Sequence, residues 1–329
     1  MAHNVFVLVS PNLTHAPKKG GRTHRLVGGL TLPERVAYEL AKQGHPSVHF
    51  IGVKNKEEVL SRAPGPEIEI HVHPSPSLVE AVESAGLSPE ATVVVVRGDR
   101  VYGKELLSAA LATDLASEET PDLAPKEGAP TIERPVVTLL SESHEEQGAT
   151  RLGITISKAS TLLKLIEKAS KTGSPGIPND PVDEQTALNE AAVDAGALTS
   201  KPVPDTFWHP VENKAHLKPA RDALFKSLGK SIDGWVAKHF NRPVSQAVSK
   251  RIANTPLTPN QISAVVFLFG LSAAVVTLTG QWIWIAIGAV IFHFASVFDG
   301  VDGEIARVKY QSTKFGALLD SILDHIVIV

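Results

Sequence analysis

Four aspartates lie close together near the C-terminal end of the sequence: Asp299, Asp302, Asp320 and Asp324. They belong to the segment VFDGVDGEIARVKYQSTKFGALLDSILDH, which directly follows a long apolar region. Charged side chains beside such a region are costly unless a metal ion, a partner or a function compensates them. The plainer alternative is that they are acidic caps of ordinary helices.

Helical spacing would place the first half of this segment on one face. Asp299, Asp302, Gly303 and Ala306 follow one another at i, i+3, i+4 and i+7, which is one side of a helix. The glycine and the alanine remove side-chain bulk on that side. A ligand could therefore approach the backbone directly next to the two carboxylates.

The second half of the segment repeats this arrangement on the next helix. Asp320 and Asp324 are four residues apart, and Gly316 lies one turn earlier on the same face. Two antiparallel helices could bring all four carboxylates to one point, where four anions need compensation. Hard divalent cations with oxygen ligands provide it. The chemistry that uses a carboxylate-held metal pair in this way is displacement at phosphorus.

The complete pattern, D-x-x-D-G-x-x-A-R-x8-G-x3-D-x3-D, resembles the signature of the CDP-alcohol phosphotransferase family. The resemblance implies transfer of a phosphoalcohol from a CDP-alcohol to an acceptor hydroxyl with release of CMP, in phospholipid or inositol-phospholipid synthesis. It also implies about six membrane spans and a homodimer. The eight fixed positions are Asp299, Asp302, Gly303, Ala306, Arg307, Gly316, Asp320 and Asp324.

The family resemblance implies separate roles for the four carboxylates. Asp299, Asp302 and Asp320 would hold the metal ions, two of Mg2+ or Mn2+. Asp324 would be a further metal ligand, and it would also be the general base that deprotonates the acceptor hydroxyl. The metal ions would bridge the diphosphate of the donor and stabilise the departing CMP.

The nucleotide-binding residues follow from the same resemblance. Arg307 would brace the carboxylate of Asp302 or a phosphate. The segment TPLTPNQIS resembles the T-P-N sequence with which the family enters its first span, and this makes Asn260 a candidate nucleotide contact. The small residues of the pattern would accept the CDP moiety: Gly303, Ala306 and Gly316.

Two uncharged stretches precede the aspartates, NQISAVVFLFGLSAAVVTLTG and QWIWIAIGAVIFHFASVF. Each has about the ~20 residues that cross a hydrocarbon core. Buried core helices are the alternative, but two such stretches joined by a tight hairpin favour a lipid bilayer. Basic residues before the first stretch and after the second predict that both ends face the cytosol. We therefore expect an integral membrane protein whose active site and N-terminal domain are cytosolic.

The residues before the hairpin, 216–256, are expected to form basic helices on which Phe240 and Val244 share an apolar side. An interfacial helix is favoured over a solvated linker helix because of the membrane segment that follows. The sequence thus predicts three parts: an α/β domain (1–215), interfacial or juxtamembrane helices (216–256), and the start of an all-α membrane domain (257–329). The last part holds two spans and the start of a third, so we expect the sequence to be truncated.

The N-terminal part alternates buried strands with helices. NVFVLVS, SVHFIGV and ATVVVVRGD are apolar runs of strand length. Between the first two, LPERVAYELAKQG has the helical pattern, with Val36 and Leu40 on one face and Gly44 as a C-terminal stop. Buried runs separated by helices predict an α/β domain with a mainly parallel sheet.

This domain resembles sugar-phosphate nucleotidyltransferases through LVGGLTLPERVAYELAKQG, VVVVRGDRVYG and FWHPVENKAHLKPARDAL. Fused to a CDP-alcohol phosphotransferase, it resembles the bifunctional inositol-1-phosphate cytidylyltransferase/di-myo-inositol-phosphate phosphate synthases. Arg22 stands about where the family has a catalytic lysine, and Pro210 and Glu212 stand in place of the acidic pair that the family has in the closing segment. Asp99 keeps a metal-binding position or is simply a turn aspartate after a strand. We therefore expect a catalytically degenerate domain, retained for docking or regulation.

Composition narrows the function further. The 329 residues carry a formal net charge of −3, which does not indicate nucleic-acid binding. The absence of cysteine excludes disulfides and thiol chemistry. Two alternatives to the phosphotransferase stay open: a cytidylyltransferase in the N-terminal domain that forms CDP-inositol or another CDP-alcohol, and a non-catalytic binding module anchored in the membrane.

Overall fold

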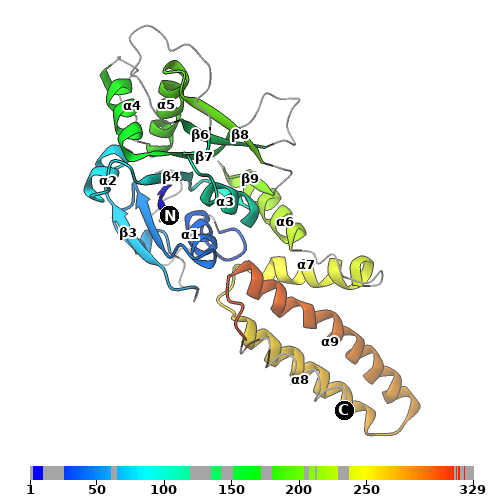
Figure 1. The fold of residues 1–329 in the computed structure, drawn as a ribbon. Helices are drawn as coiled ribbons and strands as arrows, with labels where there is room; N and C mark the ends of the chain where they lie inside the picture. The colour runs from blue at the N-terminus through cyan, green and yellow to red at the C-terminus, as the bar shows by residue number, and fades with distance from the viewer. Residues whose placement is uncertain are drawn as a thin grey trace. The chain divides into compact units, whose positions relative to one another are not determined.

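The computed structural model describes residues 3–9, 26–60, 65–118, 135–141, 151–171, 180–203, 207–211, 213–228, 237–314, 316, 318 and 322. The chain divides into two compact units (Figure 1). The first comprises Met1–Arg25, Thr31–Ser61 and Glu67–His216. The second comprises Leu26–Leu30, Arg62–Pro66 and Leu217–Val329.

The first unit is built on a seven-stranded sheet with the order β3-β2-β1-β4-β7-β6-β8. Neighbouring strands pair in parallel except at β7, which is antiparallel to both β4 and β6. The expected α/β class with a mainly parallel sheet is thereby confirmed. The strands are β1 (Asn4–Leu8), β2 (Ser47–Ile51), β3 (Glu69–His73), β4 (Thr92–Arg97), β6 (Val136–Ser141), β7 (Arg151–Lys158) and β8 (Leu198–Val203).

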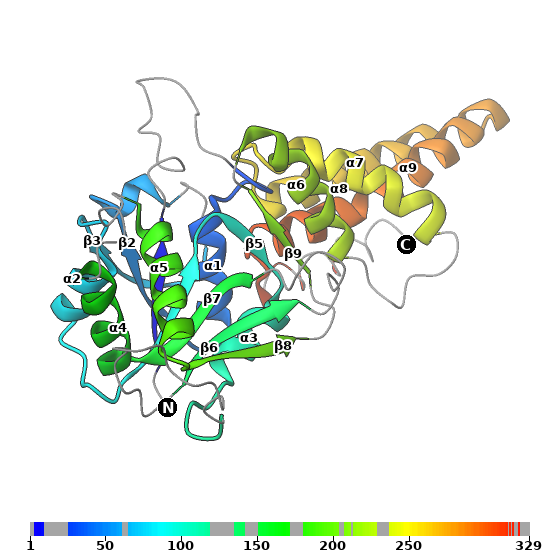
Figure 2. The ribbon, with the colours of Figure 1, turned by 90° about the horizontal axis from the view of Figure 1, so that it is seen from above.

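Helices cover both faces of this sheet, as Figure 2 shows from a second direction. Helices α1 (Leu32–Lys42) and α3 (Lys104–Leu111) pack on one face. The other face is covered by α2 (Leu78–Ser84), α4 (Ala159–Lys171) and α5 (Pro181–Asp194). Short 3-10 turns, η1 (Lys56–Glu58) and η3 (Lys214–His216), and a separate two-stranded sheet of β5 (Arg100–Tyr102) and β9 (Trp208–Pro210), complete the unit.

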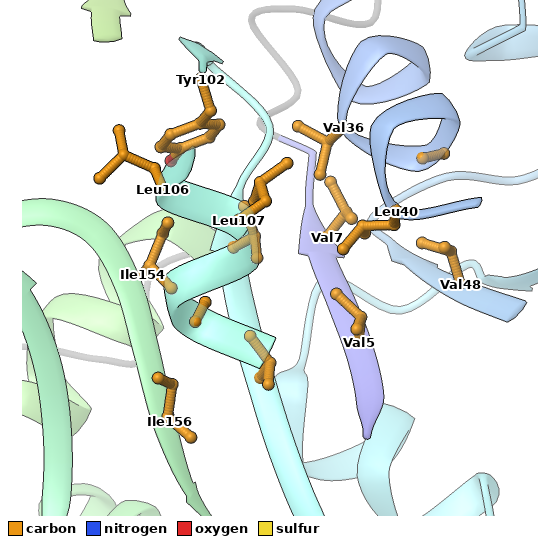
Figure 3. Packing of buried hydrophobic residues seen from close by; sticks show 14 of the residues in the cluster. Val5, Val7, Val36, Leu40, Val48, Tyr102, Leu106, Leu107, Ile154 and Ile156 are labelled. Atoms are coloured by element: carbon orange, nitrogen blue, oxygen red, sulfur yellow. The ribbon is translucent and has the colours of Figure 1, made fainter. Parts of the chain in front are cut away.

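The core explains why the apolar runs form central strands. Val5 and Val7 of β1 point to the face that α1 and α3 cover, where they meet Val36, Leu40 and Leu107 (Figure 3). The alternate residues of β1 enter the opposite core, because successive side chains of a strand point to opposite faces. A strand covered on both sides must be apolar throughout, as the sequence indicated.

Helix α1 has the boundaries that its sequence predicts. The side chain of Thr31 caps the backbone amide of Glu34, and Glu34 in turn accepts from the amide of Thr31. The helix stops before Gly44, whose φ of +88° is the left-handed conformation that glycine adopts without strain.

From Leu217 onward the second unit consists mainly of helices in the part of the chain that the structure describes. Helices α8 and α9 form an antiparallel hairpin (Figure 1), and both are long and apolar enough to cross a membrane. Many of their large apolar side chains are exposed, among them Val265, Leu268, Val275, Leu278, Trp282 and Val290. The elements are α6 (Leu217–Ser227), the π-helical turn η4 (Ala237–Asn241), α7 (Arg242–Ile252), α8 (Pro259–Thr277) and α9 (Trp282–Val308).

Local signals fix the ends of the hairpin. Thr258 and Gln261 form a capping box at the start of α8, and a proline occupies the first turn. Helix α9 does not stop where its apolar stretch ends but continues through the first half of the aspartate motif to Val308. The first half of the motif is therefore a direct extension of an apolar helix, one face of which can reach water.

Candidate active site

The carboxylate of Asp302 is held between the two helices of the hairpin. Asp302 is only 6% exposed, although it lies where α9 leaves the apolar stretch. One carboxylate oxygen accepts a hydrogen bond from the hydroxyl of Ser263 on α8, and the other accepts from the backbone amide of Gly303. These two hydrogen bonds fix the orientation of the Asp302 carboxylate, which helical spacing places on the same face of α9 as Asp299.

Ser263 was not among the residues expected from the sequence. It follows Asn260 by three positions on α8, so both lie on the side of the helix that faces the motif. The sequence did contain a signal for it. Ser263 is a hydroxyl residue three positions after the candidate Asn260, in the first turns of an apolar stretch. Because the donor comes from a different helix, only the tertiary structure shows which carboxylate it contacts.

The structure brings Asn260 together with Gly316. A Cβ atom on Gly316 would lie 3.4 Å from Asn260 Oδ1 and 3.1 Å from Thr313 Oγ1. The hydroxyl of Thr313 also accepts from the amide of Gly316, at 2.9 Å, as in a helix N-cap. Two residues proposed separately as nucleotide contacts are thus neighbours, and a Cβ atom at position 316 would already touch both Thr313 and Asn260.

Gly303, Ala306 and Arg307 lie on the last turns of α9, and all three are partly exposed. A Cβ atom on Gly303 would lie 3.4 Å from Arg307 Nη1, so the guanidinium group extends over this part of the helix. The backbone at position 303 is therefore accessible next to a cation, which suits a phosphate-bearing ligand.

The second pair of carboxylates, Asp320 and Asp324, lies outside the described residues. Within the part of the chain that the structure describes, no three His, Cys, Asp or Glu side chains converge as a metal site would need. Of the four expected metal ligands, Asp299 and Asp302 lie within the described residues.

A buried ion pair supports the motif from the other side of α9. Glu304, 1% exposed, accepts from Arg242 Nη1 at 3.0 Å and from Ser245 Oγ at 2.9 Å. Both donors belong to α7, on which Val244 is exposed, as is Phe240 in the preceding turn η4. Glu304 lies between two motif residues in the sequence, but nothing local indicated that α7 would bury it.

Lys309 closes the end of α9. Its side chain is buried, and Nζ donates to the carbonyl oxygens of Thr255 at 2.7 Å and Leu257 at 2.9 Å. Burial lowers the pKa of this lysine. It thereby joins the last turn of α9 to the loop that precedes Thr258 and α8.

In the first unit, Asp99 follows β4, next to the end of β1. It is 6% exposed and accepts from Arg97 Nη2 at 2.5 Å and from Arg97 Nε at 3.1 Å. Strands β5 and β9 pair Arg100 with Pro210, and the amide of Val211 donates to the carbonyl oxygen of Asp99 at 2.8 Å.

The segments VVVVRGDRVYG and FWHPVENKAHLKPARDAL, which carry the nucleotidyltransferase resemblance, are therefore neighbours through β5 and β9. Pro210 occupies one of the positions at which that resemblance implies an acidic residue. Arg22 and Glu212, the remaining candidates of this domain, lie outside the described residues. The carboxylate of Asp99 instead pairs with Arg97, the last residue of β4.

Comparison with known proteins identifies the class of the C-terminal region. Residues 256–329 match the family model described as CDP-alcohol phosphatidyltransferase. These residues include α8, α9 and the whole aspartate motif, so the family resemblance expected from the motif is confirmed for this region.

Particular relatives carry more specific names. The chain is 36% identical over 122 residues to a "Bifunctional IPC transferase and DIPP synthase" of Aquifex aeolicus, a match covering 37% of this chain and 27% of that protein. It is 37% identical over 94 residues to a "Phosphatidylinositol phosphate synthase" of Corynebacterium glutamicum, covering 27% of this chain and 41% of that protein. The chain thus spans well under half the length of either relative.

Solved structures similar to the chain are nucleotidyltransferases. An inositol-1-phosphate CTP transferase from T. maritima has a TM-score of 0.41 at 13% identity, over 68% of this chain and 94% of that one. A 2-C-methyl-D-erythritol 4-phosphate cytidylyltransferase from Francisella tularensis has a TM-score of 0.43 at 10% identity, over 68% and 100%.

Proposed function

We propose that this protein is a membrane-embedded CDP-alcohol phosphotransferase that moves a phosphoalcohol from a CDP-alcohol to an acceptor hydroxyl and releases CMP. One observation carries the proposal. Within the region that matches the family, Asp302 is buried and oriented by Ser263, while Asn260 adjoins Gly316. Residues distant in the sequence thus meet around the aspartate motif.

The lipid bilayer is the proposed environment of α8 and α9. Their exposed apolar side chains would be costly in water, whereas a hydrocarbon core removes that cost. Basic residues at both ends of the hairpin favour a cytosolic position for the motif. Turn η4 and helix α7, which expose Phe240 and Val244 respectively, fit an interfacial location beside it.

The donor set suits hard divalent cations. Asp299 and Asp302, with Asp320 and Asp324, would supply only carboxylate oxygens, the ligands that Mg2+ and Mn2+ prefer. Two bound ions would supply positive charge to the diphosphate of the donor.

The residues of the chain would bind the CDP-alcohol donor and accept the proton of the acceptor hydroxyl. Arg307 would contact a phosphate, and the backbone at Gly303, Ala306 and Gly316 would admit the CDP moiety, with Asn260 as a further contact. Asp324 would accept the proton of the acceptor hydroxyl as its oxygen attacks the β-phosphorus. The bond between that phosphorus and the bridging oxygen breaks, and CMP leaves with the oxygen.

The N-terminal domain is proposed to lack nucleotidyltransferase activity. Its one retained acid, Asp99, is paired with Arg97, and Pro210 occupies the neighbouring position on β9. The rival function, CDP-alcohol formation from CTP, predicts pyrophosphate release by residues 1–214 expressed alone with a sugar phosphate or inositol phosphate. We expect none.

The proposal is tested with membranes that contain the full-length protein. Labelled CDP-diacylglycerol or CDP-inositol is incubated with a panel of hydroxyl acceptors, inositol phosphates among them, and CMP release is followed. We expect release that EDTA abolishes and Mg2+ or Mn2+ restores, and that Asp302→Asn eliminates. No release with any donor would favour the membrane-anchored binding module. Light scattering of the purified protein would test the proposed homodimer.

A further inference from the structure

A short turn from the N-terminal sequence belongs to the second unit. Val27 and Leu30 form a β-bridge, and both are completely buried. Gly28 and Gly29 between them have φ of +62° and +86°, which glycine adopts at little cost. The turn lies before α1 in the sequence, yet residues 26–30 group with α6–α9.

Gly29 contacts the end of the juxtamembrane helix. Its amide donates to Asn254 Oδ1 at 2.9 Å. A Cβ atom at this position would lie 2.3 Å from the carbonyl oxygen of Ala253 and 2.9 Å from Lys309 Cε. The contact with Ala253 is with backbone, so it could not be relieved by rotating a side chain. The close approach therefore requires glycine for space as well as for conformation.

Lys309 links the glycine turn to the start of α8. Its ammonium group bonds the carbonyl oxygens of Thr255 and Leu257, directly before the N-cap residue Thr258. Asn260 lies in the first turn that Thr258 caps. A continuous series of contacts thus runs from Gly29 through Lys309 to the helix start that places Asn260 beside Gly316.

We propose that the Val27–Leu30 turn and Lys309 are positioning elements of the phosphotransferase site. The turn packs against Ala253, Asn254 and Lys309, and Lys309 holds the loop that presents Asn260 to the nucleotide. This inference rests on the proposed function. It gives part of the N-terminal sequence a role in phosphoalcohol transfer that does not depend on nucleotidyltransferase activity.

The chain offers a matched control for the turn. Gly44 has a φ of +88°, almost the same as Gly29, but a Cβ atom there would meet nothing within 4 Å. Gly29→Ala and Gly44→Ala therefore impose a similar backbone cost, while only the first introduces a steric clash, with Ala253 and Lys309 of the same unit. The same logic pairs buried Lys309 with exposed Lys226, so that Lys309→Met is compared with Lys226→Met.

Two readouts on the full-length protein in lipid nanodiscs test the inference. Hydrogen exchange of the peptide spanning residues 252–258 reports whether the loop is held, without reference to activity. Binding of CDP-diacylglycerol reports whether the loop positions the nucleotide site. We expect Gly29→Ala and Lys309→Met to speed exchange there and to weaken binding about tenfold or more. Lys309→Arg, which keeps the charge and donors, should recover part of that binding.

The two control variants should match the wild type within about twofold. Exchange in Gly29→Ala equal to that in Gly44→Ala would overturn the structural part of the inference. Faster exchange with unchanged CDP-diacylglycerol affinity would overturn the positioning role. If the wild-type protein bound no CDP-diacylglycerol, the proposed function would be in error, while the exchange comparison would still decide whether the turn holds the loop.

Discussion

The hydroxyl of Ser263 donates a hydrogen bond to the carboxylate of Asp302, thirty-nine positions later in the chain. The donor lies in the first turns of α8 and the acceptor in the last turns of α9. The pair therefore links the entry of the hairpin to the aspartate motif, and it fixes one carboxylate before any ligand binds.

Removal of this hydroxyl should weaken the site without unfolding the hairpin. A hydrogen bond to a charged group contributes about 1.5–3 kcal/mol, so Ser263→Ala should lower CMP release or metal affinity roughly 10- to 100-fold. The matched control is Ser272→Ala on the same helix, because Ser272 is exposed and its hydroxyl donates to the carbonyl oxygen of Phe269 in its own helix. Equal activities of the two variants would contradict the role assigned to Ser263.

The buried Arg242–Glu304 pair should contribute to the stability of the second unit. Loss of one partner leaves an uncompensated charge, which costs about 3–5 kcal/mol when burial is complete and less here, because the Arg242 side chain is 18% exposed. We expect Glu304→Gln to lower the Tm of the solubilised protein by several degrees. The double variant Arg242→Met/Glu304→Leu should recover much of that loss.

The control for this experiment is an exposed pair. Lys104 and Glu105 lie 3.8 Å apart with most of both side chains in solvent, so Glu105→Gln should leave the Tm almost unchanged. A Glu304→Gln variant as stable as Glu105→Gln would show that the buried pair does not stabilise the contact between α7 and α9.

Three histidines make the first unit sensitive to acid. The ring of His49 stacks on Phe6 and on His71, and its Nδ1 lies 3.0 Å from Nε2 of His73, whose Nδ1 is in turn 3.1 Å from Ser84 Oγ. Burial, and then the neighbouring His71 and His73, lower the pKa of His49 to about 4. Burial also lowers the pKa of His73. Glu69 lies 3.5 Å from His71 at the open edge of the group.

The sign of the pH effect follows from these shifts. Between about pH 6.5, the ordinary histidine pKa, and pH 4, the unfolded chain binds more protons than the folded one. Stability should therefore fall as the pH is lowered through this window. His49→Phe keeps the stacking but cannot titrate, so it should flatten the dependence, whereas His239→Phe at an exposed site should not. The pH dependence of the stability is measured by urea unfolding, followed through hydrogen exchange of β2 and β3. Identical pH profiles for wild type and His49→Phe would contradict the account.

The sequence predicted the elements that depend on local patterns. The strands β1 and β4 are continuous apolar runs, α1 has an apolar face that ends at Gly44, and the two halves of the hairpin are uncharged stretches. Contacts between residues that are distant in the sequence could not be predicted from such local patterns. The β5–β9 pairing, the burial of Glu304 under α7 and the bond from Gly29 to Asn254 each join segments whose approach is set by the tertiary fold. Of the site, the aspartate motif supplied Asp302 and Gly316, and the TPLTPNQIS segment supplied Asn260, but neither indicated Ser263 or Lys309, whose partners lie on other elements.

The two carboxylates of the second motif helix should differ in role. Asp324→Asn keeps the shape of the side chain but cannot accept the acceptor proton, a loss of about 10²–10⁴ in rate for a general base. Binding of CDP-diacylglycerol should survive this change, whereas Asp302→Asn should weaken both metal and nucleotide binding. Affinity and turnover are compared for each variant. Equal loss of nucleotide binding in both would make Asp324 primarily a metal ligand and require a different base.

The central claim is that the acceptor oxygen attacks the β-phosphorus of a CDP-alcohol at the aspartate motif. CDP-diacylglycerol labelled with 32P at the β-position distinguishes this from every other route. In the presence of a competent hydroxyl acceptor and Mg2+, the account predicts one unlabelled CMP for each labelled phosphodiester product, with neither formed by Asp302→Asn. Label recovered in free phosphatidate, or cytidylate attached to the acceptor, would show that the enzyme does not catalyse phosphoalcohol transfer.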